Sequence, residues 1–349
     1  MARAVLCFIG LLVALPLIAL VALVFTLPIT ISGIAYLFGT MLTVSGLILA
    51  PRISRYYIPT ISGIVILMLL ASLRLLLVQN TGSTLKMLSL PQGEETTWIN
   101  TVIDEQDTIV FGEMLFHWIG GDSESEHDRL TPAFESIYSQ MRKEGSFSSP
   151  VVSTYFNLQR PSHFDAIIIK PETMPQFGVV FLHGYMGNVT AQCWVIAQAV
   201  KKVGAVTICP STVWTGEWWQ SQSQQILQST FVSLREQGIH TIYLGGFSNG
   251  GFSIGRLASE LKDEKGLAGL FFIDGFMNGT GVRDLGLPVL IIEGTQDERV
   301  PPAVAQSFAS EVGELGTYVE IDSDHFLIMK QSLLVQNVIS SWLSDQMDP

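Results

Sequence analysis

The stretch Gly-Gly-Phe-Ser-Asn-Gly-Gly, residues 245–251, follows directly on the apolar run 239–244. A serine with a glycine two positions before it and another two positions after it, between an apolar run and a helix-like segment, predicts a tight strand–turn–helix junction. Gly246 and Gly250 supply the room for this turn, because a Cβ atom at either position would collide with neighbouring backbone. The hydroxyl group of Ser248 would then stand exposed at the end of the strand, in the geometry called a nucleophile elbow.

A regular alternation of short apolar runs and helix-length segments begins at Asp165. It predicts a mostly parallel sheet whose two faces are covered by helices. The expected strands are residues 166–169, 178–182, 205–209, 241–244, 270–273, 289–292 and 317–321. The expected helices between and after them are residues 191–203, 224–237, 253–262, 302–312 and 332–346.

Polar motifs follow four of these strands at the sheet edge where open α/β sheets bind their ligands. They contain His183, Ser248, Asp297 and His325. A serine hydroxyl is a poor nucleophile until a base removes its proton, and an imidazole can accept that proton and return it. An aspartate beside the imidazole fixes its tautomer and stabilises its charged form. His183 is expected to bond its own loop and to take no part in proton transfer.

The motifs from about residue 165 to residue 345 resemble those of the α/β-hydrolase superfamily, in which nucleophile, acid and histidine follow one another along the chain. The resemblance implies the triad Ser248, Asp297 and His325, which would act through an acyl-enzyme intermediate. It also implies that the backbone N–H groups of Tyr185 and Asn249 form the oxyanion hole. Asp274 stays open as the alternative acid. It follows the expected strand 270–273, and some members of the superfamily carry their catalytic acid at the end of the corresponding strand. Residues 275–287 are too few for a large cap.

The substrate is predicted from the side chains near this edge. The loop 211–219 carries three tryptophans, and either an apolar wall for a substrate group or packing against a helix would explain them. No pair of basic residues suggests a clamp for a phosphate or carboxylate, which favours a neutral, partly apolar ester or thioester. No metal-ligand spacing is evident among the histidines, so neither a metal nor a cofactor is expected. The possible lining residues are Met186, Trp214, Trp218, Trp219, Phe247 and Phe276.

The N-terminal part predicts three membrane-spanning helices, at about residues 4–27, 29–50 and 58–78. Residues 4–50 contain no charged residue, and this run is long enough for two spans of about 20 residues each. A buried core hairpin and a cleaved signal peptide are the alternatives. Arg3, Arg52 and Arg55 would share the cytoplasmic side, against Arg74 and Lys86 on the other side, so the catalytic domain is expected outside the cytoplasm.

The charge distribution and the cysteines support two further predictions, on binding partners and on the state of the thiols. Residues 1–93 hold five of the 19 basic residues and no acid, so the rest of the chain carries 14 basic and 31 acidic residues, a balance of −17. Such a domain is a poor partner for nucleic acid or for an anionic lipid surface. The expected partners are a small-molecule or lipid-like ester substrate and, through the N-terminal helices, the lipid bilayer. For Cys193 and Cys209, two buried thiols are favoured over a disulfide.

The predicted organisation is a transmembrane region over residues 1–80, a linker over 81–93, a helical extension without assigned chemistry over 94–160, and a catalytic domain over 161–349. The predicted function is that of a membrane-anchored serine hydrolase. A peptidase or amidase with the same triad, and a non-catalytic binding protein on a hydrolase scaffold, are the alternatives.

Overall fold

The computed structural model describes residues 29–49, 57–78, 84–118, 124–145 and 147–347. The chain divides into two compact units. The first unit comprises Met1–Val78 and Thr101–Gly121, and the second comprises Gln79–Asn100 and Asp122–Pro349. Every residue of the predicted site belongs to the second unit.

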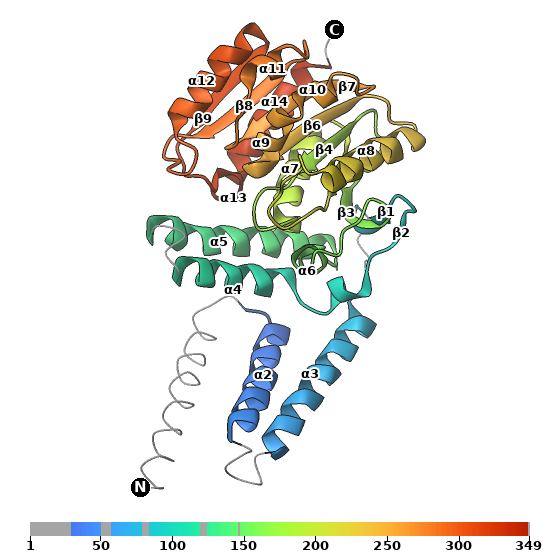
Figure 1. Ribbon diagram of the computed structural model, residues 1–349, viewed down its shortest axis with the longest axis vertical. Coiled ribbons are helices and arrows are strands. Elements are labelled where there is room, and N and C mark those ends of the chain that lie inside the picture. Colours follow the sequence, from blue (N-terminus) through green and yellow to red (C-terminus); the bar gives the residue numbers. More distant parts are fainter. Residues whose placement is uncertain (1–28, 50–56, 79–83, 119–123, 146, 348–349) are drawn as a thin grey trace. The chain divides into compact units, whose positions relative to one another are not determined.

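The first unit contains two long apolar helices, α2 (Ile31–Leu49) and α3 (Tyr57–Leu77), drawn in blue in Figure 1. Both are long and apolar enough to cross a bilayer. The two helices pack closely, since a Cβ atom on Gly46 would lie 2.1 Å from Oγ1 of Thr60. Small residues at such contacts are typical of helix pairs in membranes. The predicted first span, residues 4–27, lies outside the described residues.

Arg74 places a charge near the end of the otherwise apolar helix α3. Its guanidinium group donates hydrogen bonds of 2.9 Å to the Thr101 carbonyl and to the Ser32 hydroxyl, and it lies 3.6 Å from the Asp104 carboxylate. The charge is therefore partnered near the end of the helix. The helix α4 (Glu105–Trp118) follows in the same unit.

The second unit is built on a nine-stranded sheet with the order β2-β1-β3-β5-β4-β6-β7-β8-β9. Strands β4 to β9 run parallel to one another, whereas β3 is antiparallel to both β1 and β5. Without the short β2, this is the strand order of the α/β-hydrolase fold, and the prediction of that fold is confirmed. The strands are β1 (Leu85–Leu90), β2 (Glu94–Glu95), β3 (Phe164–Ile169), β4 (Gly178–Leu182), β5 (Val206–Pro210), β6 (Ile242–Phe247), β7 (Leu267–Ile273), β8 (Val289–Gly294) and β9 (Gly316–Ile321).

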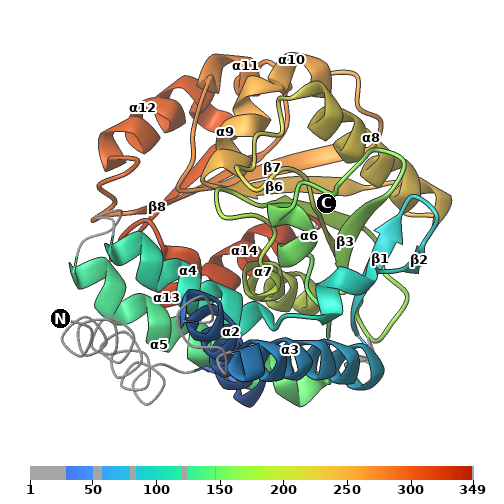
Figure 2. The same cartoon turned by 60° about the horizontal axis from the view of Figure 1, so that its bottom comes forward.

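Helices cover both faces of the sheet, as Figure 2 shows. Helices α7 and α14 contact each other on one face, and α8 to α12 lie on the opposite face. Between β7 and β8 the chain forms the short helix α11 and no large cap, as expected. The helices are α5 (Glu124–Met141), α6 (Val151–Tyr155), α7 (Thr190–Lys202), α8 (Ser221–Glu236), α9 (Asn249–Arg256), α10 (Ala258–Leu261), α11 (Gly279–Arg283), α12 (Pro302–Val312), α13 (Leu327–Lys330) and α14 (Ser332–Asp345).

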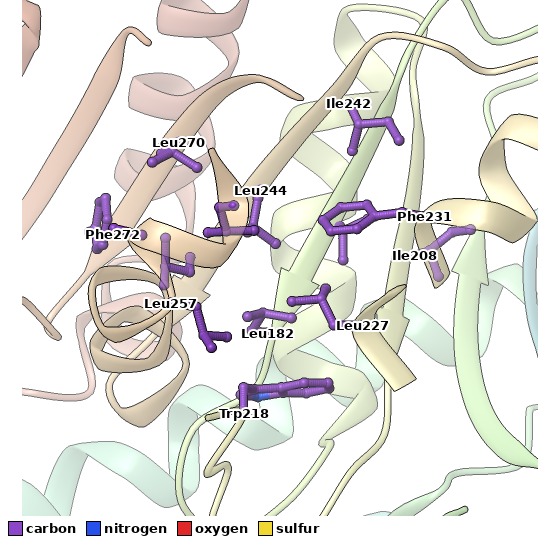
Figure 3. Packing of buried hydrophobic residues seen from close by; sticks show 14 of the residues in the cluster. Leu182, Ile208, Trp218, Leu227, Phe231, Ile242, Leu244, Leu257, Leu270 and Phe272 are labelled. Carbon is purple, nitrogen blue, oxygen red and sulfur yellow. The ribbon is translucent and has the colours of Figure 1, made fainter. Parts of the chain in front are cut away.

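An apolar core lies between the sheet and the layer of α8 to α12 (Figure 3). Leu182 and Leu244 project from neighbouring strands toward Leu227 and Phe231 of α8, and each is at most 3% exposed. Complete burial of one such side chain contributes about 1.5–3 kcal/mol to the free energy of folding. The core therefore fixes the central strands, and with them the positions of the loops at their carboxyl ends.

The predicted linker over residues 81–93 is wrong in its central part. Leu85–Leu90 forms β1, which pairs in antiparallel register with β3 along its whole length. Its side chains alternate: Leu85 and Met87 are buried, whereas Lys86 is exposed. The pattern is short and interrupted by polar residues, so it gives a weak signal in the sequence.

A buried carboxylate ties the predicted extension to the sheet. Asp165 on β3 is 1% exposed, and Oδ2 accepts hydrogen bonds from Ser153 (2.7 Å) and Asn100 (2.8 Å). The segments before and after residue 100 thus converge on one strand. The other donors to this carboxylate are the hydroxyl groups of Ser89, Thr96 and Thr97, the Thr97 amide and the Gln159 side chain.

Cys193 and Cys209 form a disulfide, so the prediction of two thiols is wrong. Helix α7 returns against strand β5, and this contact brings the two Cα atoms to 6.1 Å. The spacing of 16 residues in the sequence does not reveal such a contact. Disulfides of this kind persist in oxidising compartments.

Candidate active site

Ser248 occupies the turn between β6 and α9 with backbone angles φ 52° and ψ −120°. A residue with a side chain rarely adopts this conformation, and such strain is typical of functional turns. The two glycines are required as the sequence indicates. A Cβ atom on Gly250 would lie 2.1 Å from the Leu182 carbonyl oxygen, and one on Gly246 would lie 2.4 Å from the Gly250 carbonyl carbon.

The structure brings Ser248, His325 and Asp297 into one hydrogen-bonded chain. Nε2 of His325 lies 3.0 Å from Oγ of Ser248, and Nδ1 of the same ring lies 2.7 Å from Oδ2 of Asp297. The second oxygen of Asp297 accepts from the amides of Arg299 (2.8 Å) and Val300 (2.9 Å), which holds the carboxylate in place. His325 and Asp297 are 6% and 3% exposed, so the chain of bonds is shielded from water.

The two predicted oxyanion donors lie beside Ser248. Asn249 is the first residue of α9, so its N–H group has no partner within the helix. Tyr185 follows Gly184, whose backbone approaches the elbow so closely that a Cβ atom there would lie 3.0 Å from Cβ of Ser248. The start of α9 and the loop after β4 thus lie near Ser248, where such donors would be needed.

His183 holds in shape the loop after β4, residues 183–188, which is called the oxyanion loop after its predicted role. Its Nδ1 lies 2.9 Å from the Gly184 carbonyl oxygen and its Nε2 lies 3.3 Å from the Thr212 amide, so the neutral ring donates at one nitrogen and accepts at the other. Burial lowers the pKa of His183 to about 4, which keeps the ring neutral at physiological pH. The Trp218 ring packs edge-on against it at 5.2 Å.

Asp274, the alternative acid, is buried beside the triad without bonding to the imidazole. Its Oδ1 accepts from the Gly294 amide at 3.0 Å, and its backbone φ is 47°. One ligand atom each from Asp274, Asp297 and His325 lies within 4.8 Å of the others. A metal ion held by these three atoms would compete with the hydrogen bonds of the triad.

Glu293 was not singled out from the sequence, yet it completes a buried group of carboxyls with Asp274 and Asp297. It is the penultimate residue of β8 and is 0% exposed. No N–H or hydroxyl group among the described residues donates to its oxygens, and its carboxyl group shares a hydrogen bond with the carboxyl group of Asp274. Burial, followed by the nearby charge of Asp297, raises the pKa of Glu293 to about 8. Burial and then the Glu293 and Asp297 charges raise the pKa of Asp274 well above its ordinary value.

The predicted lining residues have different surroundings. Trp214 is 37% exposed beside Tyr185, and Met186 is half-buried in the oxyanion loop. Phe247 is buried and packs against the His325 ring at 5.3 Å.

The prediction is wrong for Trp218 and Phe276, which are 0% and 2% exposed and belong to the core. Figure 3 shows Trp218 below Leu182 and Leu227, and its indole N–H donates to the His183 carbonyl oxygen at 3.1 Å. Trp219 is half-buried under the Arg256 guanidinium group, 5.0 Å from the ring centre, which fits the alternative of packing against a helix.

A hollow of about 450 Å³ lies beside the loop that carries His325. Helix α5, from the predicted extension, forms one wall, and the segments next to Asp297 and His325 form the other. Its lining is polar for the most part and includes Arg129, Ser136, Gln296, Asp324, Lys330 and Gln331. Lys330 bonds Asp324 at 2.6 Å, so its charge is partnered within the hollow.

No protein-family model and no curated protein matches this chain. Among solved structures it is similar to Est1E from Butyrivibrio proteoclasticus, with 15% identity, 54% of this chain and 96% of that chain covered, and a TM-score of 0.46. An α/β serine hydrolase homologue from Coxiella burnetii has 19% identity over 52% and 92% of the two chains, with a TM-score of 0.44. The esterase domain of a Rhodothermus marinus protein has 14% identity over 52% and 92%, with a TM-score of 0.44.

Proposed function

We propose that the protein is a serine hydrolase that cleaves a carboxylic ester or thioester. The observation that carries the proposal is the chain of hydrogen bonds from Ser248 through His325 to Asp297, placed on a strained elbow. A turn serine without a catalytic role would need neither the strained backbone nor the buried imidazole at 3.0 Å.

In the first step, Oγ of Ser248 forms a bond to the carbonyl carbon of the ester while Nε2 of His325 takes the hydroxyl proton. The carbonyl oxygen becomes an oxyanion, which the N–H groups of Tyr185 and Asn249 would stabilise. As the carbonyl reforms, the bond to the alcohol oxygen breaks, and that oxygen leaves with the proton from His325.

In the second step, a water molecule attacks the acyl-enzyme and gives its proton to His325. The bond between the acyl carbon and Ser248 then breaks, Oγ recovers the proton, and the acid leaves. Asp297 holds the imidazole in the tautomer that accepts at Nε2 and stabilises its cationic form in both steps.

The proposal includes a location at a membrane with the catalytic domain outside the cytoplasm. Helices α2 and α3 have the length and composition of membrane spans. Arg3, Arg52 and Arg55 favour a cytoplasmic position for the segments that bear them. The disulfide between Cys193 and Cys209 agrees with an oxidising compartment on the other side.

The test is to label the full chain, purified in detergent, with a fluorophosphonate probe. We expect labelling of the wild type and complete loss in Ser248→Ala. Ser259→Ala, which changes an exposed serine, is the matched control and should label as the wild type does. Equal labelling of the wild type and Ser248→Ala, or none in a folded wild type, would refute the proposed function.

A further inference from the structure

Three aromatic side chains from separate parts of the second unit form an exposed group, here called the aromatic wall: Tyr155, Tyr185 and Trp214. The Tyr185 and Trp214 rings meet edge to face with centres 4.8 Å apart, and the Tyr155 ring lies 6.5 Å from that of Trp214. They are 36%, 47% and 37% exposed, respectively. Rings of this size that touch one another and still face solvent offer apolar surface to a ligand.

Backbone contacts place the aromatic wall next to the nucleophile. The side-chain amide of Asn249, the residue after Ser248, donates to the Thr215 carbonyl oxygen at 2.8 Å. A Cβ atom on Gly187 would lie 2.9 Å from Cγ2 of Thr154 and 3.8 Å from Cα of Trp214. The oxyanion loop, α6 and the loop after β5 therefore converge beside the elbow.

The strand order places the aromatic wall on the side of Ser248 opposite the imidazole. Tyr185 follows β4 and Trp214 follows β5, and both strands lie on one side of β6. Asp297 follows β8 and His325 follows β9, and both strands lie on the other side. The alcohol oxygen of an ester must lie near Nε2 of His325 to receive its proton, so the acyl group extends the other way.

We propose that the aromatic wall binds the acyl group of the substrate, and that this acyl group is apolar and larger than acetyl. The inference rests on the proposed function and deepens it by assigning a substrate class. It also gives the predicted extension a part in the site, since Tyr155 belongs to α6. Each methylene group buried on such a surface should raise kcat/KM about fourfold.

The test compares p-nitrophenyl acetate, octanoate and 3-phenylpropanoate as substrates of the full chain in detergent. Trp214→Ala and Tyr155→Ala should lower kcat/KM for one or both of the larger esters by roughly tenfold to a hundredfold, and for acetate by less than about threefold. The ester that loses more identifies a straight-chain or an aryl acyl group. Phe156→Ala is the control, because Phe156 is 65% exposed next to Tyr155 but outside the aromatic wall.

Trp214→Phe guards against misfolding and should restore most of the selectivity. Equal losses for all three esters in folded variants would overturn the proposal. Losses of kcat/KM that depend on the size of the alcohol group, measured with ethyl and octyl acetate, would also overturn the proposal. If the folded wild type hydrolyses no ester and takes no fluorophosphonate label, the proposed function itself fails. Active wild type with unchanged selectivity in the variants refutes only the acyl assignment.

Discussion

Asp165 and Glu293 are both buried carboxyl groups on strands of one sheet, and their surroundings are opposite. Asp165 is 1% exposed and receives hydrogen bonds from hydroxyl, amide and backbone donors on both sides. Glu293 is 0% exposed, receives no hydrogen bond from an N–H or hydroxyl group of the described residues, and neighbours the carboxyl groups of Asp274 and Asp297. The donors around a carboxyl, and not its burial alone, decide whether its charge is stable in the folded protein.

The two sets of buried carboxyl groups have different roles. The donors to Asp165 come from segments far apart in the chain, so the carboxylate joins the predicted extension to β3. The group of Asp274, Glu293 and Asp297 lies at the ends of β7 and β8, where one carboxylate orients His325.

The largest effect should come from the carboxylate that bonds His325. Asp297→Asn removes the acceptor that fixes the imidazole tautomer, and we expect kcat for an ester substrate to fall by about four orders of magnitude. Asp274→Asn should lower kcat by less than about tenfold, because Asp274 bonds the Gly294 amide and not the ring. Steady-state kinetics of both variants measures this. A large loss in Asp274→Asn alone would show that the acid is misassigned.

The next effect concerns stability. Asp165→Ala leaves several buried donors without an acceptor, and each such donor costs about 1–3 kcal/mol. We expect the free energy of unfolding of the full chain in detergent to fall by about 3 kcal/mol or more, measured by urea denaturation. Asp165→Asn keeps the shape and one acceptor oxygen, so its loss should be smaller. A loss below about 1 kcal/mol in the alanine variant would mean that water replaces the carboxylate.

The smallest effect is a change in pH dependence. The folded-state pKa of Glu293 is raised from 4.5 to about 8, so between these values the folded protein keeps a proton that the unfolded chain releases. The stability supplied by the protonated group is fully present below pH 4.5 and is lost as the pH rises through 8. The Glu293→Gln variant carries a neutral amide that does not ionise. At pH 9 its free energy of unfolding should therefore exceed that of the wild type by about 1–3 kcal/mol. Thermal or urea unfolding at pH 5 and pH 9 measures the difference, and parallel profiles for the two proteins would contradict it.

The sequence could predict those parts of the site whose signals are local. The elbow needs glycines within two residues of Ser248, and the buried strands of the parallel sheet are continuous apolar runs. Glu293 was missed because its surroundings come from the loops of β7, β8 and β9, which no local pattern places together. Trp214 and Trp218 differ for the same reason, since the path of their loop directs one ring outward and the other into the core. The Cys193–Cys209 bond likewise depends on how α7 returns to β5.

The pairing of β1 with β3 bears on any attempt to prepare the catalytic part in soluble form. A truncation that starts at Glu94, where the predicted linker ends, removes β1 and leaves the Phe164–Ile169 edge bare. Phe164, Ile167 and Ile169 lie on that strand, and an exposed apolar edge recruits strands from other molecules. We expect such a fragment to aggregate even though the active site is intact in each folded copy. A fragment that begins at or before Thr84 keeps β1, which covers the edge of β3.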